Sequence, residues 1–261
     1  MAQYIPILLL PVSLVCTKGK FHDRVKCSIL FIVFVAVAVI PWAGRNYMRY
    51  GAWALTTQLG HNMLYDNASL LESNRTHTPL AEVQGRLMGV IDRMNISNPF
   101  EKSTVQTKYA VSLMREHPID YVLIHVRGMV NLYLSPDTRP ILNLMGRKPS
   151  EFPDGFVITS SLRTKMQAFF KYKSSLEIFM GLFLILLWIV VYLCTIGGFI
   201  GLFREREWAV FIVLLGTVVY FTIIVGPIGY SRLKLPIIPV YSVVAAYFLL
   251  LPQSRLGPFE R

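Results

Sequence analysis

The sequence has few of the residues that build metal sites, disulfides and catalytic acid–base pairs. Its three cysteines, Cys16, Cys27 and Cys194, lie in or beside apolar runs without CxxC spacing. Its five histidines show neither HxxxH nor HExxH spacing. A disulfide framework and a zinc centre are therefore not expected, and the cysteines are interpreted as small buried residues. No pair of carboxylates in the long central segment is typical of acid–base catalysis. We expect no metal and no cofactor.

Acidic residues are also scarce. The chain has 15 Asp and Glu against 26 Lys and Arg, which gives a formal net charge of +11. In a water-soluble protein this excess would raise nucleic acid as a partner, but no nucleic-acid motif and no basic block interleaved with aromatic residues is present. Loops that set membrane topology, and contacts with anionic lipid or phosphate, explain the charge better. We therefore expect membrane lipids as partners and no nucleic acid.

Apolar residues, in contrast, are abundant and occur in blocks. The chain is 54% hydrophobic and its mean hydropathy is +0.48. Blocks of this kind predict membrane spans, which need about 20 apolar residues each. The sequence thus predicts an all-α integral membrane protein with about five transmembrane helices and a large helical extracytoplasmic loop. The five apolar runs are residues 2–16, 27–42, 176–203, 208–230 and 235–251.

Charge in the short loops predicts the orientation, because Lys and Arg are favoured on the cytoplasmic side. Residues 1–42 then form two spans joined by a basic cytoplasmic loop. Residues 43–175 form an extracytoplasmic, mostly helical region, and residues 176–261 form three spans and a short cytoplasmic tail. We expect a bacterial inner (cytoplasmic) membrane, with the large loop facing the periplasm.

Three amphipathic helices are predicted inside this loop. Thr78 and Pro79 mark the first start, Asn98 and Pro99 the second, and Pro118 the third. We expect some of these helices to lie in the membrane interface with their apolar faces toward lipid. The broad face predicted for the third helix consists of Tyr121, Ile124, His125, Gly128, Leu132 and Leu134.

A polar cluster follows the second apolar run, in the segment Pro41-Trp42-Ala43-Gly44-Arg45-Asn46-Tyr47. One interpretation is an interfacial belt, in which aromatic rings lie at headgroup depth and arginines extend to water. The other is a phosphate clamp, because the planar Arg45 guanidinium matches phosphate oxygens and Asn46 and Tyr47 add neutral donors. Both interpretations stay open on these residues alone.

A second basic cluster, Arg232 and Lys234, precedes the last apolar run on the same expected outer face. It is interpreted either as a tight hairpin with basic anchors or as a second contact to the same anionic headgroup. Gly197 and Gly201 have the GxxxG spacing that permits close helix packing. Whether their neighbour belongs to this chain or to another stays open.

These segments together resemble membrane glycosyltransferases of the GT-C class, of the dolichyl-phosphate-mannose-protein mannosyltransferase and aminoarabinose-transferase type. The resemblance rests on residues 41–47 and 51–57, on Gly60-His61-Asn62-Met63-Leu64-Tyr65-Asp66-Asn67, on His117-Pro118, and on residues 230–239. It implies an enzyme that transfers sugar from a polyprenyl-phosphate donor on the extracytoplasmic face. Arg45, Arg232 and Lys234 would then hold the lipid phosphate, with Asn46 and Tyr47 in support.

The resemblance covers the C-terminal half of such enzymes. The catalytic base that it implies belongs to an outer loop upstream of this sequence, so no catalytic residue is assigned and enzymatic activity stays uncertain. A separate N-terminal half or other membrane subunits are then expected as partners. The alternative is a catalytically inactive transmembrane accessory subunit of a larger membrane complex. A transporter is disfavoured because Glu177 is the sole acidic residue within an apolar run and lies near its end.

Overall fold

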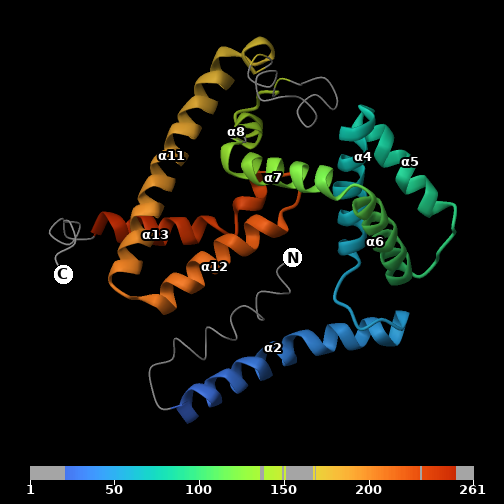
Figure 1. Cartoon of the computed structure of the whole chain (residues 1–261), viewed down its shortest axis with the longest axis horizontal. Coiled ribbons are helices and arrows are strands. Elements are labelled where there is room, and N and C mark those ends of the chain that lie inside the picture. The colour runs from blue at the N-terminus through green and yellow to red at the C-terminus, as the bar shows by residue number, and fades with distance from the viewer. Residues whose placement is uncertain are drawn as a thin grey trace. The chain divides into compact units, whose positions relative to one another are not determined.

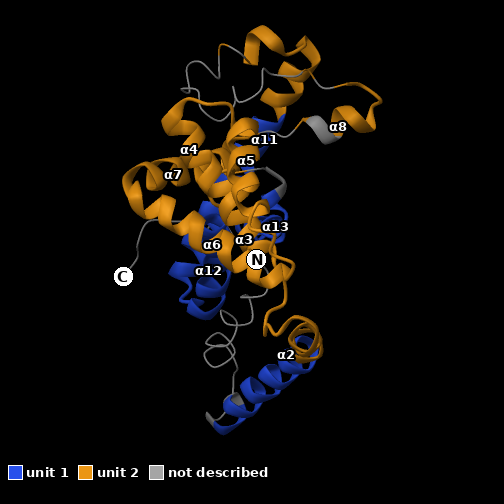
Figure 2. Ribbon diagram, turned by 90° about the vertical axis from the view of Figure 1, so that its right-hand side faces the viewer, with its two compact units in different colours: residues 1–39, 184–224, 232–261 blue, residues 40–183, 225–231 orange. Residues whose placement is uncertain are grey.

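The computed structural model describes residues 21–135, 138–148, 150, 167, 169–229 and 231–250, and within these ranges it contains helices and no strands (Figure 1). The chain divides into two compact units (Figure 2). Unit 1 comprises residues 1–39, 184–224 and 232–261, and unit 2 comprises residues 40–183 and 225–231. The divisions at residues 39 and 183 fall inside two long helices, α2 (Phe21–Tyr50) and α11 (Ser175–Arg204).

Within the described residues, two helices are long and apolar enough to cross a membrane, Val25–Tyr50 within α2 and all of α11. Of the residues in the most apolar stretch of each helix, only 6% in α2 and 11% in α11 are buried. In a water-soluble protein a core helix is mostly buried. Their apolar side chains therefore face outward, as lipid-exposed helices require.

The other expected spans give shorter helices or lie elsewhere. α12 (Trp208–Ile224) has 17 residues and α13 (Ile238–Leu250) has 13. The helical path stops after α12 because Gly226 adopts a φ of 71° and Pro227 follows it. The expected span over residues 2–16 lies outside the described residues.

Unit 2 has a core formed by amphipathic helices. Its packed elements are α3 (Gln58–His61), the π-helix η2 (Asn62–Ala68), α4 (Ser69–Thr76), α5 (Leu80–Asp92), α6 (Pro99–Glu116) and α7 (Pro118–Leu134). The short α8 (Arg139–Leu144) follows. Their shared apolar cluster consists of Leu64, Ala68, Leu70, Leu71, Val83, Leu87, Ile91, Ala110, Met114 and Ile124.

The local start signals position these helices as predicted, with one small shift. The Asn98 side chain caps α6, because its Oδ1 accepts hydrogen bonds from the backbone nitrogens of Phe100 and Glu101 at 3.0 and 3.4 Å. α7 begins at Pro118 as predicted. α5 begins one residue later than predicted, because Pro79 has an extended ψ of 135° and stays outside the helix.

Residues 225–231 also belong to unit 2, and Gly226, Pro227 and Gly229 among them contact the middle of α7. A β-carbon added to Gly128 would collide with the carbonyl oxygens of Gly226 and Pro227. The two backbones therefore touch at Gly128, and any larger side chain there would push them apart.

Within unit 1, small residues of α11 pack against α13. A β-carbon on Gly197 would meet the ring of Phe248, and one on Gly198 would collide with the carbonyl oxygen of Val244. Gly201 is also buried. Gly197 and Gly198 thus meet a helix of the same chain, whereas the neighbour of Gly201 stays open.

Candidate functional site

The segment singled out by the sequence is the last part of a helix rather than a helix exit. α2 continues past Pro41 and Trp42 to Tyr50, eight residues beyond the end of the apolar run. Gly51 then ends the helix with a φ of 72°, and its nitrogen donates to the Tyr47 carbonyl oxygen at 2.8 Å. The helical geometry therefore fixes the relative directions of Arg45, Asn46 and Tyr47.

Asn46 forms a hydrogen bond that holds the segment after Gly51 against the side of α2. The Asn46 side chain is 3% exposed, and its Nδ2 donates to the Ala54 carbonyl oxygen at 2.7 Å. One turn earlier, Trp42 Nε1 donates to the Leu55 carbonyl oxygen at 3.0 Å. Asn46 Oδ1 accepts from Arg45 Nη1 at 3.2 Å. Asn46 is thus placed to position Arg45 and the returning chain.

Arg45 presents most of its guanidinium group to the surroundings. Its side chain is exposed, and the guanidinium carbon lies 4.8 Å from the centre of the Trp42 ring. A guanidinium group has five N–H donors, and among the described residues Arg45 gives one hydrogen bond, to Asn46. The stacking and this single bond hold the group in place while its other donors stay available to an anion.

Aromatic rings surround this helix end. Tyr47 stacks on Trp53 with a centroid separation of 5.1 Å, and both side chains are largely exposed. Tyr50 contacts Phe100 at 5.5 Å, and Asn98 Nδ2 donates to the Tyr50 carbonyl oxygen at 2.9 Å. The end of α2 is therefore attached to the start of α6, and its exposed rings suit the headgroup depth of a membrane.

Lys234 belongs to unit 1, in the short 3-10 helix η3 (Ser231–Lys234). It is 2% exposed, and its Nζ lies 4.8 Å from the centre of the Trp188 ring. Trp188 in turn packs with Tyr192 and Tyr241 at 5.5 and 6.4 Å between centroids. Lys234 is thus a buried cation beside an aromatic cluster. The side chain of Arg232 lies outside the described residues.

Among the predicted phosphate ligands, the structure therefore joins Arg45 to Asn46 directly and places Tyr47 next to them on α2. A phosphate shared by these residues with Arg232 and Lys234 stays a prediction. Comparison of the chain with family models, with curated proteins and with solved structures gives no match. The resemblance to membrane glycosyltransferases accordingly remains a hypothesis that rests on the segments quoted above.

One of those segments, residues 60–67, contains an unusual helix. Residues Asn62–Ala68 form a π-helix, a form that is frequently found at functional sites. Asn67 Nδ2 donates to the Asn62 carbonyl oxygen at 3.0 Å, and Gln58 Nε2 donates to Asn62 Oδ1 at 2.7 Å. His61 stacks on Tyr65 at 4.9 Å. The periodicity of the sequence did not reveal this wider helical turn.

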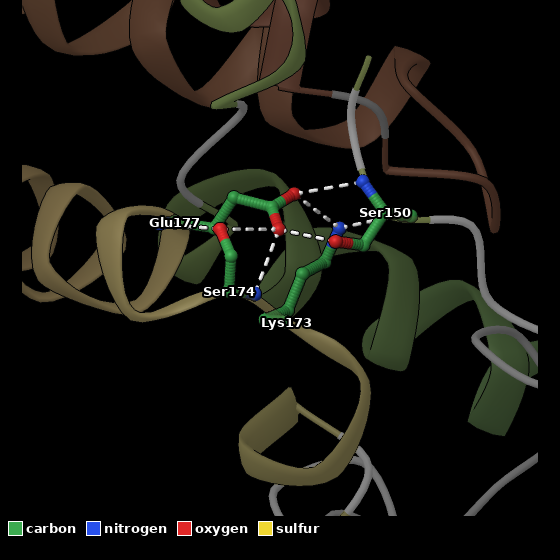
Figure 3. Close-up of polar contacts among 4 residues, drawn as sticks. All are labelled: Ser150, Lys173, Ser174 and Glu177. Carbon is green, nitrogen blue, oxygen red and sulfur yellow. Dashed lines mark hydrogen bonds and ion pairs between the residues drawn. The ribbon is translucent and has the colours of Figure 1, made fainter. Parts of the chain in front are cut away.

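The sequence reasoning also missed a buried carboxylate network at the start of α11 (Figure 3). Glu177 is 2% exposed, and its Oε1 accepts from Ser150 N at 3.0 Å and from Lys173 Nζ at 3.1 Å. Its Oε2 accepts from Ser174 N at 2.9 Å and from the hydroxyls of Ser174 and Ser150.

Part of this network is a capping box that the sequence does contain. Ser174 precedes the first residue of α11, and its Oγ accepts a hydrogen bond from Glu177 N at 3.3 Å. In return, Ser174 N donates to the Glu177 carboxylate, which completes the capping box. The spacing Ser-x-x-Glu is the signal that could have found it. Because every described contact of the Glu177 carboxylate is a donor that stabilises its charge, this group is structural rather than a free catalytic base.

Proposed function

We propose that the chain is a membrane glycosyltransferase-like protein that binds a polyprenyl phosphate through Arg45 at the end of α2. The exposed, stacked guanidinium group of Arg45 carries this proposal. In the same proposal the chain has about five spans, and unit 2 lies on the extracytoplasmic side of a bacterial inner membrane.

The physical argument concerns preorganisation. An arginine that is free to rotate loses side-chain entropy when it binds a phosphate, whereas Arg45 already rests on Trp42 and on Asn46. Its position after the apolar part of α2 suits a ligand with a lipid tail and an anionic head. A planar fork of donors then binds two phosphate oxygens at once.

The test measures binding of a polyprenyl phosphate to the purified full chain in lipid nanodiscs. We expect Arg45→Ala to raise the Kd at least tenfold, which corresponds to about 1.4 kcal/mol, close to the lower limit for one charged hydrogen bond. Arg45→Lys should give an intermediate Kd, because lysine keeps the charge but loses the planar fork.

Arg49→Ala is the matched control, since Arg49 is an exposed arginine one turn later on the same helix. Among the described residues Arg49 has no aromatic partner and no hydrogen bond that would hold it, so its removal should change the Kd less than threefold. Single variants of Arg232 and Lys234 measure the contribution of those residues in the same assay. Unchanged binding in Arg45→Ala would make Arg45 an interfacial anchor and would remove this proposal.

A further inference from the structure

α7 has two apolar faces, and unit 2 uses one of them. Ile124, Gly128 and Leu132 are buried, Ile124 within the apolar cluster of unit 2 and Gly128 against Gly226 and Pro227. On the opposite side an outer stripe of large apolar side chains is 48–74% exposed. The outer stripe consists of Ile119, Val122, Leu123, Val126, Val130 and Leu134.

The spacing of the outer stripe shows that it is one continuous surface. Its residues are separated by three, four, seven, eleven and fifteen positions from Ile119, which places them along a single side of an α-helix. The core of unit 2 is complete without them, because Ile124 and Leu132 are 4% and 0% exposed. Single exposed apolar side chains are normal on a protein surface, but six adjacent ones form a contiguous patch, which is typical of an interaction surface.

The chain path indicates what covers the outer stripe. Residues 40–183 of unit 2 are continuous at both ends with helices that are long and apolar enough to cross a membrane, α2 and α11. Both helices run across the unit boundary without a break, so unit 2 is held within reach of a bilayer at two points. α7 has 17 residues and is about 25 Å long at 1.5 Å per residue, too short to cross a hydrocarbon core of about 30 Å.

An exposed basic residue borders the outer stripe. Arg127 is exposed at its edge, and among the described residues it has no ion-pair partner. The acidic residue on the same flank, Asp120, lies 3.6 Å from Arg75, which also pairs with Glu72 at 2.9 Å. An exposed basic side chain beside an apolar stripe is typical of interfacial helices.

We infer that α7 lies along the bilayer surface, with its outer stripe inserted among the lipids and Arg127 at the level of anionic headgroups. This inference does not depend on phosphate binding by Arg45. It assigns the membrane contact to a face that shares only Leu134 with the one that the sequence pattern emphasised, because Tyr121, Ile124 and Gly128 of that pattern pack within unit 2.

Site-directed spin labelling of the full chain tests this inference. Single cysteines replace Val122, Val126 or Val130 in a background in which Cys16, Cys27 and Cys194 are serine, and each variant is reconstituted into phosphatidylcholine and phosphatidylglycerol vesicles. Labels at these exposed positions leave the core of unit 2 intact. Collision rates are then measured with oxygen, which concentrates in the hydrocarbon, and with a nickel chelate, which stays in water.

We expect labels on the outer stripe to collide with oxygen several times more than with the nickel chelate. A label in the matched variant Lys108→Cys, on the exposed side of α6, should collide with the chelate instead. Chelate access along the outer stripe would overturn the inference, because the face would then be in water. Protection from both reagents would also overturn it, because the face would then be covered by protein, a second copy or another subunit.

Discussion

The core helices of unit 2 and the long helix α11 differ in the kind of residue that they mainly bury. In unit 2 the buried cluster is formed by large apolar side chains such as Leu71 and Ile91, both 0% exposed. In unit 1 the α11 residues that are buried include Thr195 and Gly198, whereas Leu193 and Ile196 of the same helix point outward and are more than half exposed. α11 thus buries mainly small and polar residues, with Leu202 as an exception, whereas α12 and α13 of unit 1 bury Phe221, Tyr241 and Val244.

The difference between α11 and the core of unit 2 is the one expected between a helix packed in lipid and a core formed in water. In water, burial of apolar area drives helices together, so the large apolar residues go inside. In lipid the tails are as apolar as leucine, so helices associate through close packing of small residues and through hydrogen bonds. Thr195 Oγ1 donates a hydrogen bond to the Val191 carbonyl oxygen at 2.7 Å, because a hydroxyl in an apolar helix needs a partner within the helix.

The largest test of the comparison removes one leucine from each region. Leu71→Ala in unit 2 should lower the free energy of unfolding by about 4 kcal/mol, because it removes a fully buried side chain and leaves a cavity. Leu193→Ala on the outer side of α11 should cost less than about 1 kcal/mol in detergent, because no packed neighbour is lost. Denaturant unfolding in micelles measures both, and an equal loss would remove the contrast between the two regions.

A second test targets the buried polar network within unit 2 at the start of α11. Glu177→Gln leaves the Lys173 ammonium, 7% exposed, without its carboxylate, and breaking a buried pair in this way should cost about 3 kcal/mol. The matched variant is Glu72→Gln, which breaks the more exposed pair with Arg75 and should cost at most about 1 kcal/mol. The same unfolding assay applies, and a loss in Glu177→Gln no larger than in Glu72→Gln would show that the network contributes little.

Local signals in the sequence predicted much of unit 2. Asn98-Pro99 and Pro118 position α6 and α7 because a cap and a proline act on the first turn alone, without any distant partner. The apolar runs likewise predicted α2 and α11 as candidate spans. The end of α2 was wrong by eight residues, since the change from apolar to polar side chains at Trp42 marks a change of surroundings and not of backbone conformation.

The sequence pattern did not predict contacts between segments that are distant along the chain. The returning chain that meets Asn46 depends on the φ of Gly51, and the partner of Glu177 at Ser150 is 27 residues away. The two apolar faces of α7 show the same limit, because periodicity reveals that a face is apolar but does not say whether protein or lipid covers it. At the candidate phosphate site the sequence shows that Arg45 and Trp42 are close along the chain, but it does not predict that the guanidinium group stacks on the Trp42 ring.

The smallest expected effect concerns the close contact of α11 with α13. Gly198→Ala places a β-carbon against the Val244 carbonyl oxygen, a backbone atom with little room to move, so the helix pair must separate at a cost of about 2 kcal/mol. Gly216→Ala in α12 is the matched control, because no atom lies within 4 Å of its new β-carbon. That variant should be stabilising by up to about 1 kcal/mol, since alanine favours a helix more than glycine does. Thermal unfolding in detergent measures the change in stability of both variants. Stabilisation by Gly198→Ala would show that this close contact does not hold α11 against α13.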